Sequence, residues 1–341
     1  MDNNTEKDTD VILEVKDLKT YFKTGPHKVV KAVEGVNFSL RKGKVLGIIG
    51  ESGSGKSVTA RSILRIVESP GYIAGGEIRF KGQDILKPPE KEMKSIRGNE
   101  ISMIFQDPTT SFNPYMTIGA QLAKAYNAHT PSGSEKAKQE IMRVLKLVGI
   151  TNGEEVIKKY PCEFSAGFRQ RIFIAMSMIL YPDLLIADEP TTSLGITIQA
   201  EIIEALSEVQ KQTGISIMII THDFGVVSQF SDDIFVMYAG RCVESASKKD
   251  LLRNPKHPYT VGLIRSVPLL EARKTKRLKS IPGFPPDMSN VPEGCPFASR
   301  CEYAKDICHK EVPALKPVGE GHMCSCHFPL DYDINEDTEL G

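Results

Sequence analysis

The sequence carries no excess of charge of either sign. Its 341 residues include 43 lysines and arginines and 43 aspartates and glutamates, so the formal net charge is zero. A neutral chain lacks the basic character with which general nucleic-acid binders meet phosphate, and it gains little attraction to an anionic membrane surface. We therefore expect no nucleic-acid partner.

Segments that would lead the chain into a membrane are also missing. The first ten residues are polar and acidic, whereas a secretory signal places a basic start before an apolar core. The most apolar stretch, residues 172–187, contains Ser177, Pro182 and Asp183 and is too short to span a bilayer. The chain is therefore expected to be intracellular and to reach a membrane only through a partner.

Cysteine is scarce outside one short segment. Of seven cysteines, only Cys162 and Cys242 lie outside residues 295–326. In a reducing compartment, such a cluster indicates a metal site rather than a disulfide framework.

Short apolar runs alternate with helical patterns along residues 45–220. The runs Val45–Ile49, Leu184–Ala187 and Ile215–Ile220 have the length and composition of strands buried on both faces. Residues 58–67 and 198–213 show helical periodicity between them. This alternation predicts an α/β fold with a mainly parallel core sheet and helices on both faces.

Other segments predict additions to that core. Residues 76–86 indicate a hairpin in a small antiparallel β subdomain, and about 107–180 indicate a helical subdomain. Prolines and then cysteines become frequent after about residue 254. We expect a polar tail at 1–11, a main domain at 12–253, a Cys-rich C-terminal extension at 254–330 and an acidic tail at 331–341.

A glycine-rich loop follows the first buried strand. It fits the pattern G-x-x-x-x-G-K-[ST], whose backbone N–H groups surround the β-phosphate of a nucleotide while the next helix points its positive end at the same charge. In this pattern Lys56 reaches the β- and γ-phosphates and Ser57 ligates Mg²⁺. A chance glycine-rich turn is disfavoured because the loop joins a buried strand to a helix. The candidate nucleotide-binding residues are Gly50, Glu51, Ser52, Gly53, Ser54, Gly55, Lys56, Ser57 and Val58.

Two carboxylates end the second apolar strand. Asp188 and Glu189 stand where α/β folds bind ligands, at the carboxyl end of a strand. Asp188 is expected to hold the Mg²⁺ and Glu189 to act as general base on the attacking water. The alternative is a carboxylate pair that simply faces solvent.

Several further motifs resemble those of ABC ATPases. Residues 164–171 (FSAGFRQR) resemble the signature motif, in which Ser165 and Gly167 contact ATP. Gln106 resembles the Q-loop glutamine, a Mg²⁺ ligand and catalytic residue, and His222 resembles the catalytic switch histidine. Phe22, beside Tyr21, is similar to the aromatic residue that stacks on adenine. The resemblance implies a P-loop ABC ATPase that binds ATP and Mg²⁺.

The C-terminal part resembles oligopeptide/dipeptide transporter ATPases. The similar segments are residues 254–260, 281–286 and 294–301, and the pair Cys326-His327. The resemblance implies an ATP-hydrolysing subunit at the cytoplasmic face of the cell membrane. Its expected partners are a second ABC ATPase subunit, two permease subunits and an extracytoplasmic substrate-binding protein. Nickel, glutathione or another small solute is an alternative cargo. A more remote alternative is that the protein is a soluble ABC ATPase that takes no part in transport.

Two positions depart from the family pattern. The signature normally has two consecutive glycines, but the first is replaced by Ala166. The D-loop normally has aspartate after leucine, but Gly195 follows Leu194. Since both motifs act on ATP held by the partner subunit, we hypothesise an asymmetric heterodimer with one slow site. The alternative is that both changes are tolerated.

Four cysteines match family positions, namely Cys295, Cys301, Cys308 and Cys326, and Cys324 is additional. Four thiolates suit a [4Fe-4S] cluster or Zn²⁺. The spacing of these cysteines is wider than that of the cysteine pairs in structural zinc sites, which favours the cluster. Zn²⁺ and free or disulfide-linked cysteines are the alternatives. The nearby histidines are interpreted as surface residues rather than ligands; they are His309, His322 and His327.

Overall fold

The computed structural model describes residues 10–26, 28–106, 111–131, 133–192, 194–266 and 281–332. Nearly all of the expected N-terminal tail, most of the acidic tail and the two residues after Gln106 in the Q-loop motif lie outside these ranges. The chain forms two compact units. The first comprises Met1–Ile12, Leu40–Val45 and Lys87–Ile220, and the second Leu13–Ser39, Leu46–Leu86 and Thr221–Gly341.

Parallel strands form the centre of the first unit. β7 (Leu184–Asp188) pairs in parallel with β6 (Ile101–Ile104) on one side and with β8 (Ser216–Thr221) on the other. All residues of these strands are buried. Continuous apolar runs form such strands because helices cover both faces of a parallel sheet.

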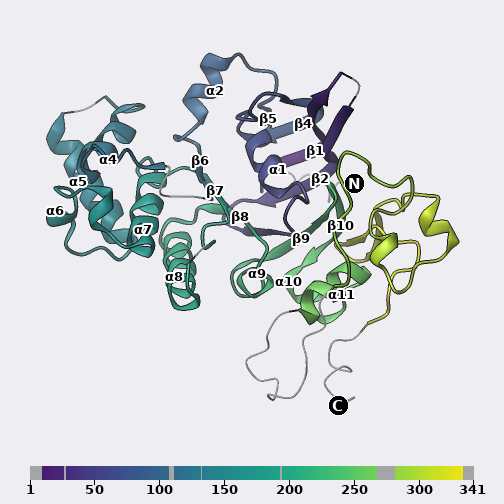
Figure 1. Cartoon of the computed structure of the whole chain (residues 1–341). Coiled ribbons are helices and arrows are strands. Elements are labelled where there is room, and N and C mark those ends of the chain that lie inside the picture. Colours follow the sequence, from purple (N-terminus) through teal and green to yellow (C-terminus); the bar gives the residue numbers. More distant parts are fainter. Residues whose placement is uncertain are drawn as a thin grey trace, which may run out of the picture. The chain divides into compact units, whose positions relative to one another are not determined.

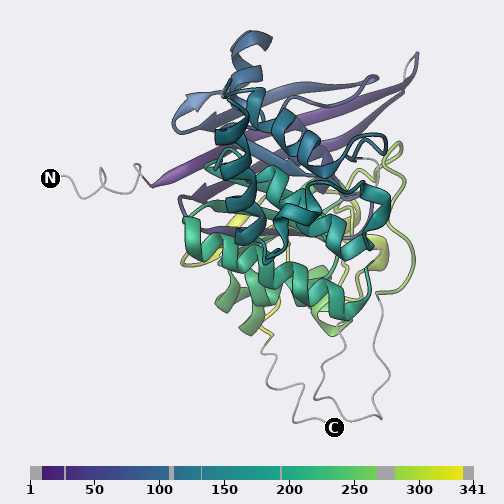
Figure 2. The same ribbon diagram turned by 90° about the vertical axis from the view of Figure 1, so that its left-hand side faces the viewer.

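Helices make up the rest of the first unit. α4 (Ile118–Asn127), α5 (Ser134–Leu147) and α7 (Ala166–Ser177) pack together, and α8 (Ile196–Thr213) packs against α7. Figure 2 views this helical group from its own side, with the teal helices toward the reader. The shorter elements of this unit are α2 (Glu90–Ile96), α6 (Gly153–Val156) and the 3₁₀ turn Pro161–Glu163.

Local sequence accounts for the ends of these helices. The Thr117 side chain accepts a hydrogen bond from Ala120 N and so caps α4. Gly214 ends α8 in the left-handed conformation, with φ of 68°, as glycine does at many helix C-termini. The helical periodicity expected over residues 198–213 therefore lies within α8.

The second unit contains strands from two sheets. One sheet has the order β2-β1-β4-β5, with β4 antiparallel to β1 and to β5. In the other, β9 runs parallel to β3 and antiparallel to β10, and β12 pairs antiparallel with β10 and β11. The bounds are β1 (Val11–Gly25), β2 (Lys28–Arg41), β3 (Val45–Ile49), β4 (Gly71–Phe80), β5 (Gln83–Asp84), β9 (Asp233–Tyr238), β10 (Arg241–Ser247), β11 (Lys316–Gly319) and β12 (His322–Cys324).

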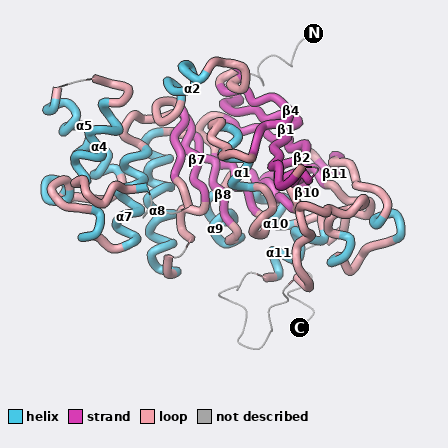
Figure 3. Tube along the Cα trace, turned by 45° about the horizontal axis from the view of Figure 1, so that its top comes forward, coloured by secondary structure: helices cyan, strands magenta, loops and turns pink. Residues whose placement is uncertain are grey.

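Four helices belong to this unit, within the described residues. They are α1 (Lys56–Ile63), α9 (Phe224–Phe230), α10 (Lys248–Arg253) and α11 (Pro258–Arg265), and they are labelled in Figure 1. Residues 281–332 add two 3₁₀ turns, Ala298–Arg300 and Asp306–His309, and otherwise run mainly as loop beside β11 (Figure 3).

One hydrophobic cluster joins the C-terminal residues to the strands of the second unit. Tyr238 of β9, Tyr259 of α11 and Phe297 all belong to it, with ring centroids 4.6 to 5.4 Å apart. Partly buried Cys295 and Cys301 pack against the same cluster. The Cys-rich segment therefore shares its core with β9 and α11.

The α/β class predicted from the sequence is confirmed. Beyond β9, the sheet continues with three antiparallel strands in the order β10, β12 and β11. β11 and β12 come from residues beyond 300. None of the helices among the described residues is both long and apolar enough to pass through a membrane.

Candidate functional site

The glycine-rich loop connects β3 to α1 in the second unit. Gly53 and Gly55 have φ values of 78° and 100°, which favour glycine. A Cβ atom on Gly55 would come within 2.3 Å of the Ala32 carbonyl oxygen, and one on Gly50 within 2.1 Å of the Met237 carbonyl oxygen. Only glycine fits at these two positions, so the loop shape depends on them.

Lys56 lies buried inside this loop. Its Nζ donates to the carbonyl oxygens of Gly50 and Glu51 at 2.7 and 2.9 Å, and to Ser54 Oγ at 3.4 Å. Among the described residues, no side chain caps α1 at Gly55, where the positive end of the helix points into the loop. The ammonium and the helix end together form a site for an anion such as a phosphate.

Glu189 is the centre of a hydrogen-bonded group in the first unit. Its Oε2 accepts from Thr192 Oγ1 at 2.6 Å and from Gln106 Nε2 at 3.3 Å, and its N–H donates to the Ile220 carbonyl at 2.8 Å. Its φ of 47° is unusual for a residue with a side chain, and strain of this kind gathers at functional sites. Asp188, the preceding residue, is buried. The structure thus brings Gln106 and Glu189 together as a polar pair.

The predicted signature residues stand at the start of α7. The Ser165 side chain accepts from Phe168 N and caps the helix. A Cβ atom on Gly167 would come within 2.4 Å of Ile198 Cγ2, so glycine here permits the close approach of α8 to α7. Gly195 immediately precedes α8, and a Cβ atom there would meet no atom within 4 Å. A larger residue therefore fits at 195 without a clash.

The remaining two predicted residues belong to the second unit, like the glycine-rich loop. Phe22 is partly buried, and its ring lies against Gly71, where an added Cβ atom would come within 2.5 Å of Phe22 Cε1. His222 directly follows β8 and is exposed. The predicted site residues therefore fall into two groups: Gln106, Ser165, Gly167, Asp188 and Glu189 in the first unit and all the others in the second.

Two residues of the C-terminal region contact the glycine-rich loop and are not predicted by the sequence. Arg300 makes two hydrogen bonds to the Glu51 carboxylate, and the Tyr259 hydroxyl accepts from Glu51 N. No motif marks either residue. The only signal in the sequence is their place in the segments that resemble the transporter extension.

The four predicted cluster cysteines line one small cavity. Cys295, Cys301, Cys308 and Cys326 surround a volume of about 20 Å³, with His327 also on its wall. Cys295 N donates to the Cys308 carbonyl at 2.7 Å, and Gly294 permits this because an added Cβ atom would lie 2.3 Å from the same oxygen. Even so, the described part of the chain holds no group of three or more His, Cys, Asp or Glu side chains arranged to bind a metal ion.

Burial governs the ionisation of these thiols. It raises the pKa values of Cys295 and Cys301 above the usual range and that of Cys326 to about 11, and nearby thiols add to the effect. Burial also raises the pKa of Cys324, which does not line the cavity and is 1% exposed. The additional cysteine is therefore a core residue of β12.

His322 corrects one interpretation from the sequence. The expectation of a surface residue is wrong, because His322 is 5% exposed and its Nε2 lies 2.7 Å from Oε1 of the fully buried Glu244. A hydrogen-bonding partner inside the second unit, the Glu244 carboxyl group, draws the imidazole inward.

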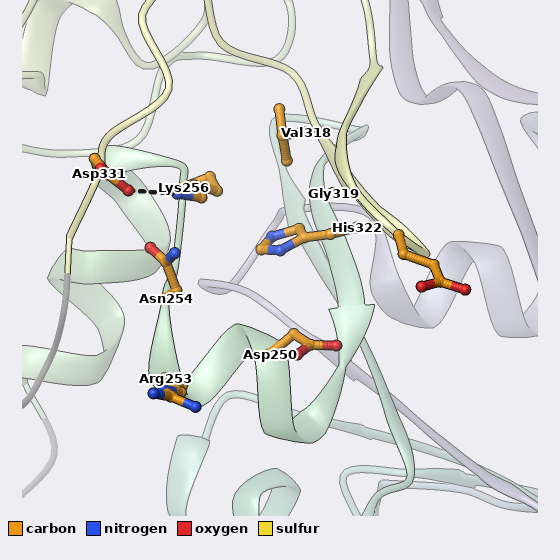
Figure 4. Close-up of a pocket in the computed structure, with 9 residues that line it drawn as sticks. Asp250, Arg253, Asn254, Lys256, Val318, Gly319, His322 and Asp331 are labelled. Atoms are coloured by element: carbon orange, nitrogen blue, oxygen red, sulfur yellow. Dashed lines mark hydrogen bonds and ion pairs between the residues drawn. The ribbon is translucent and has the colours of Figure 1, made fainter.

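A larger, polar cavity of about 780 Å³ lies beside α10 (Figure 4). Lys256 and Asp331 form an ion pair across its edge at 3.0 Å. None of the predicted site residues lines it. Its lining residues are Asp250, Arg253, Asn254, Lys256, Val318, Gly319, Glu320, His322 and Asp331.

Two family models match the chain. Residues 33–192 match the model described as ABC transporter, and residues 243–308 match that described as oligopeptide/dipeptide transporter, C-terminal region. The first range contains the glycine-rich loop, the signature residues and both carboxylates. The second contains Tyr259, Arg300 and three of the cavity cysteines.

Curated relatives are similar over nearly their whole length. The oligopeptide transport ATP-binding protein OppD of Bacillus subtilis is 47% identical over 91% of this chain and 87% of its own. The dipeptide transport ATP-binding protein DppD of the same organism is 46% identical over 92% and 94%. OppD of Escherichia coli is 44% identical over 96% of each chain.

Solved structures support the fold. The ATP-binding cassette MJ0796, a dimer bound to ADP and phosphate, gives a TM-score of 0.62 at 22% identity and covers 69% of this chain and 98% of its own. The cbiO1 protein of Clostridium perfringens gives 0.61 at 27% identity, covering 71% and 90%. The chain belongs to the ATP-binding proteins of the ABC transporter family, in the group that carries the oligopeptide/dipeptide transporter C-terminal region.

Proposed function

We propose that the chain binds Mg²⁺-ATP at the glycine-rich loop and hydrolyses it to drive the import of di- or oligopeptides. It acts as one of two ATPase subunits docked on two permease subunits at the cytoplasmic face of the cell membrane. An extracytoplasmic binding protein delivers the peptide. The observation that carries the proposal is the Glu189 carboxylate with its hydrogen-bond partners Thr192 and Gln106. The same chain also contains every fixed residue of the phosphate-loop pattern.

The residues of the chain divide the work of hydrolysis. Lys56 gives up its contacts with the loop carbonyls to bind the β- and γ-phosphates. Ser57, Asp188 and Gln106 are the oxygen donors that suit Mg²⁺, which neutralises charge on the phosphates when bound.

Glu189 accepts the proton of the attacking water. Its contacts with Thr192 and Gln106 hold the Glu189 carboxylate in position. His222 acts as the catalytic switch histidine, Phe22 stacks on the adenine, and Ser165 and Gly167 act on the ATP held by the partner subunit. These roles follow those of the corresponding motifs in the family.

The peptide cargo is inferred from the C-terminal region and from what the relatives are named for. The chain, its partner ATPase, the permeases and the binding protein would be reconstituted in liposomes, with the binding protein outside and ATP inside. Uptake of a labelled peptide that requires ATP supports the proposal. Uptake of Ni²⁺ or glutathione without peptide uptake would reassign the cargo. If the chain hydrolyses ATP without the membrane subunits, and adding them does not change the rate, a non-transport ATPase is favoured.

The two departures from the family motifs suggest unequal ATP sites. Ala166 and Gly195 belong to motifs that act on the partner's ATP, whereas Lys56, Glu189 and His222 act on the chain's own. We therefore propose a heterodimer in which the site on this chain's Lys56 is fast and the opposite site is slow.

The cysteine cavity is a candidate site for a [4Fe-4S] cluster, with Zn²⁺ as the alternative. The thiols suit either group, but the cavity of about 20 Å³ has room for about one water, so binding requires the four side chains to spread. The test is an absorption spectrum with iron, sulfide and zinc analysis of anaerobically purified protein. About four irons per chain support the cluster, about one zinc supports the alternative, and neither metal would contradict both.

A further inference from the structure

Glu51, the second residue of the glycine-rich loop, is held by the C-terminal region. Arg300 Nη1 and Nη2 donate to the two carboxylate oxygens of Glu51 at 2.6 and 2.9 Å. The Glu51 backbone N–H donates to the Tyr259 hydroxyl at 2.8 Å. Both the side chain and the N–H of Glu51 are therefore directed to residues outside the loop.

Arg300 is itself fixed in place. Its Nε donates to the Pro282 carbonyl at 2.8 Å, and its Nη1 also donates to the Tyr238 hydroxyl at 3.2 Å. Its guanidinium carbon lies 5.8 Å from the ring centres of Tyr238 and Phe297. The side chain is 4% exposed, and the hydrogen bonds to Glu51 raise its pKa, so it stays charged. Because all three guanidinium nitrogens donate hydrogen bonds, the Arg300 head group is held in one orientation and acts as a rigid anchor.

The backbone of Glu51 connects this anchor to Lys56. The carbonyl of Glu51 accepts from Lys56 Nζ, while its N–H and carboxylate are bound by Tyr259 and Arg300. The fixed backbone thus sets one wall of the space that the Lys56 ammonium shares with a phosphate.

Charge gives the anchor a second effect. A carboxylate in a phosphate-binding loop repels the phosphates, and the repulsion is strong where water is scarce. The bidentate pair with Arg300 neutralises the charge of the Glu51 carboxylate.

We propose that Arg300 and Tyr259 are positioning residues for ATP, which hold Glu51 so that the loop accepts the β-phosphate. The C-terminal region is then part of the nucleotide site as well as the mark of a transporter class. This inference rests on the proposed binding of Mg²⁺-ATP at the loop.

The test is a double-mutant cycle on the full-length chain, with Mg²⁺-ATP binding measured by titration calorimetry. Arg300→Met weakens binding at least fivefold because it leaves the Glu51 carboxylate uncompensated. Arg300→Lys restores only part of the affinity, since an ammonium neutralises the Glu51 carboxylate but cannot form the bidentate pair. In a Glu51→Gln background, Arg300→Met changes the affinity less than twofold because no charge remains to neutralise. Arg253→Met, at an exposed arginine of α10, is the matched control and leaves binding unchanged.

Each result decides a different point. If Arg300→Met weakens binding equally in the wild-type and Glu51→Gln backgrounds, Arg300 only supports the fold of the extension and the inference is wrong. Unchanged binding in Arg300→Met would also overturn it. If the wild-type chain does not bind Mg²⁺-ATP, the proposed function itself fails. Tyr259→Phe, which removes only the acceptor for Glu51 N, is expected to weaken binding at least twofold.

Discussion

Glu244 and His322 form a buried pair across 78 residues of sequence, with His322 Nε2 2.7 Å from Glu244 Oε1. The same carboxylate accepts from the backbone N–H groups of Lys256 and His257 at 2.6 and 2.9 Å. One side chain of β10 thus binds both the start of the C-terminal segment and its returning strand β12. A carboxyl group without exposed surface is tolerated there because two backbone N–H groups and the His322 ring form hydrogen bonds with it.

Removal of this carboxylate is expected to destabilise the chain. Glu244→Ala leaves two backbone N–H groups and the His322 ring without their buried partner and should lower the free energy of unfolding by about 3–5 kcal/mol. Glu244→Gln keeps the size and one acceptor and should cost less. Urea unfolding of the full-length variants measures both. A loss below about 1 kcal/mol for Glu244→Ala would show that the three contacts add little.

Acid should destabilise the chain through His257. Burial lowers its pKa from 6.5 to about 4, although Glu244 and the Ser325 backbone partly oppose the shift. Between pH 6.5 and pH 4 the unfolded chain binds a proton that the folded chain does not. The free energy of unfolding therefore decreases as the pH is lowered, by about 3 kcal/mol at pH 4. Above pH 6.5 the histidine is neutral in both states and has no effect.

The control for this pH dependence is His257→Asn. His257 caps α11 by accepting from Tyr259 N through Nδ1, and asparagine retains an acceptor at that position. Thermal or urea unfolding at pH 7 and pH 4 should show a smaller loss in the variant than in the wild type. Equal losses would mean that other groups govern the acid response.

Metal uptake at the cysteine cavity should release protons. Because burial raises the pKa values of Cys295, Cys301 and Cys326, these thiols are protonated near neutral pH and must lose their protons to bind a metal. Zn²⁺ added to metal-free protein at pH 7.5 should therefore release about three protons or more, measured with an indicator in weak buffer. Cys301→Ser should release fewer, and Zn²⁺ binding without proton release would contradict the assigned thiols.

The proposed asymmetry can be tested by restoring the family residues. Gly195 has open space around its Cα, and an aspartate there would also cap α8. In an assembled complex whose fast site carries Glu189→Gln, Ala166→Gly with Gly195→Asp should raise the residual phosphate release about tenfold, equivalent to about 1.4 kcal/mol of barrier. An unchanged residual rate would mean that the two departures are tolerated and the sites are equal.

The parts of the site that the sequence predicts are those in which local pattern determines structure. Val45–Ile49 forms β3 and Leu184–Asp188 forms β7, because short apolar runs with these lengths and flanking turn residues are typical of strands buried on both faces. The steric need for glycine at Gly50 and Gly55 explains why the loop between strand and helix is recognisable from sequence.

The contacts between distant segments are not predictable in this way. Arg300 and Glu51 are 249 residues apart, and neither has a neighbour pattern that points to the other. The hydrogen bond from Thr192 to Glu189 and the positive φ of Glu189 also depend on the folded backbone. Glu244 is the exception, because its position indicates a distant partner. It stands among buried residues of β10, and a buried carboxylate requires partners from elsewhere in the chain.

The central claim, that this chain hydrolyses ATP with Glu189 as general base, is tested most directly by Glu189→Gln. Glutamine keeps the side-chain size and the contacts with Thr192 and Gln106 but cannot take a proton from water. The account predicts Mg²⁺-ATP binding within twofold of wild type and, in the assembled complex, phosphate release reduced by roughly a hundredfold at this site, so that only the slow opposite site remains. Phosphate release near the wild-type rate would contradict the assigned base and the fast site together.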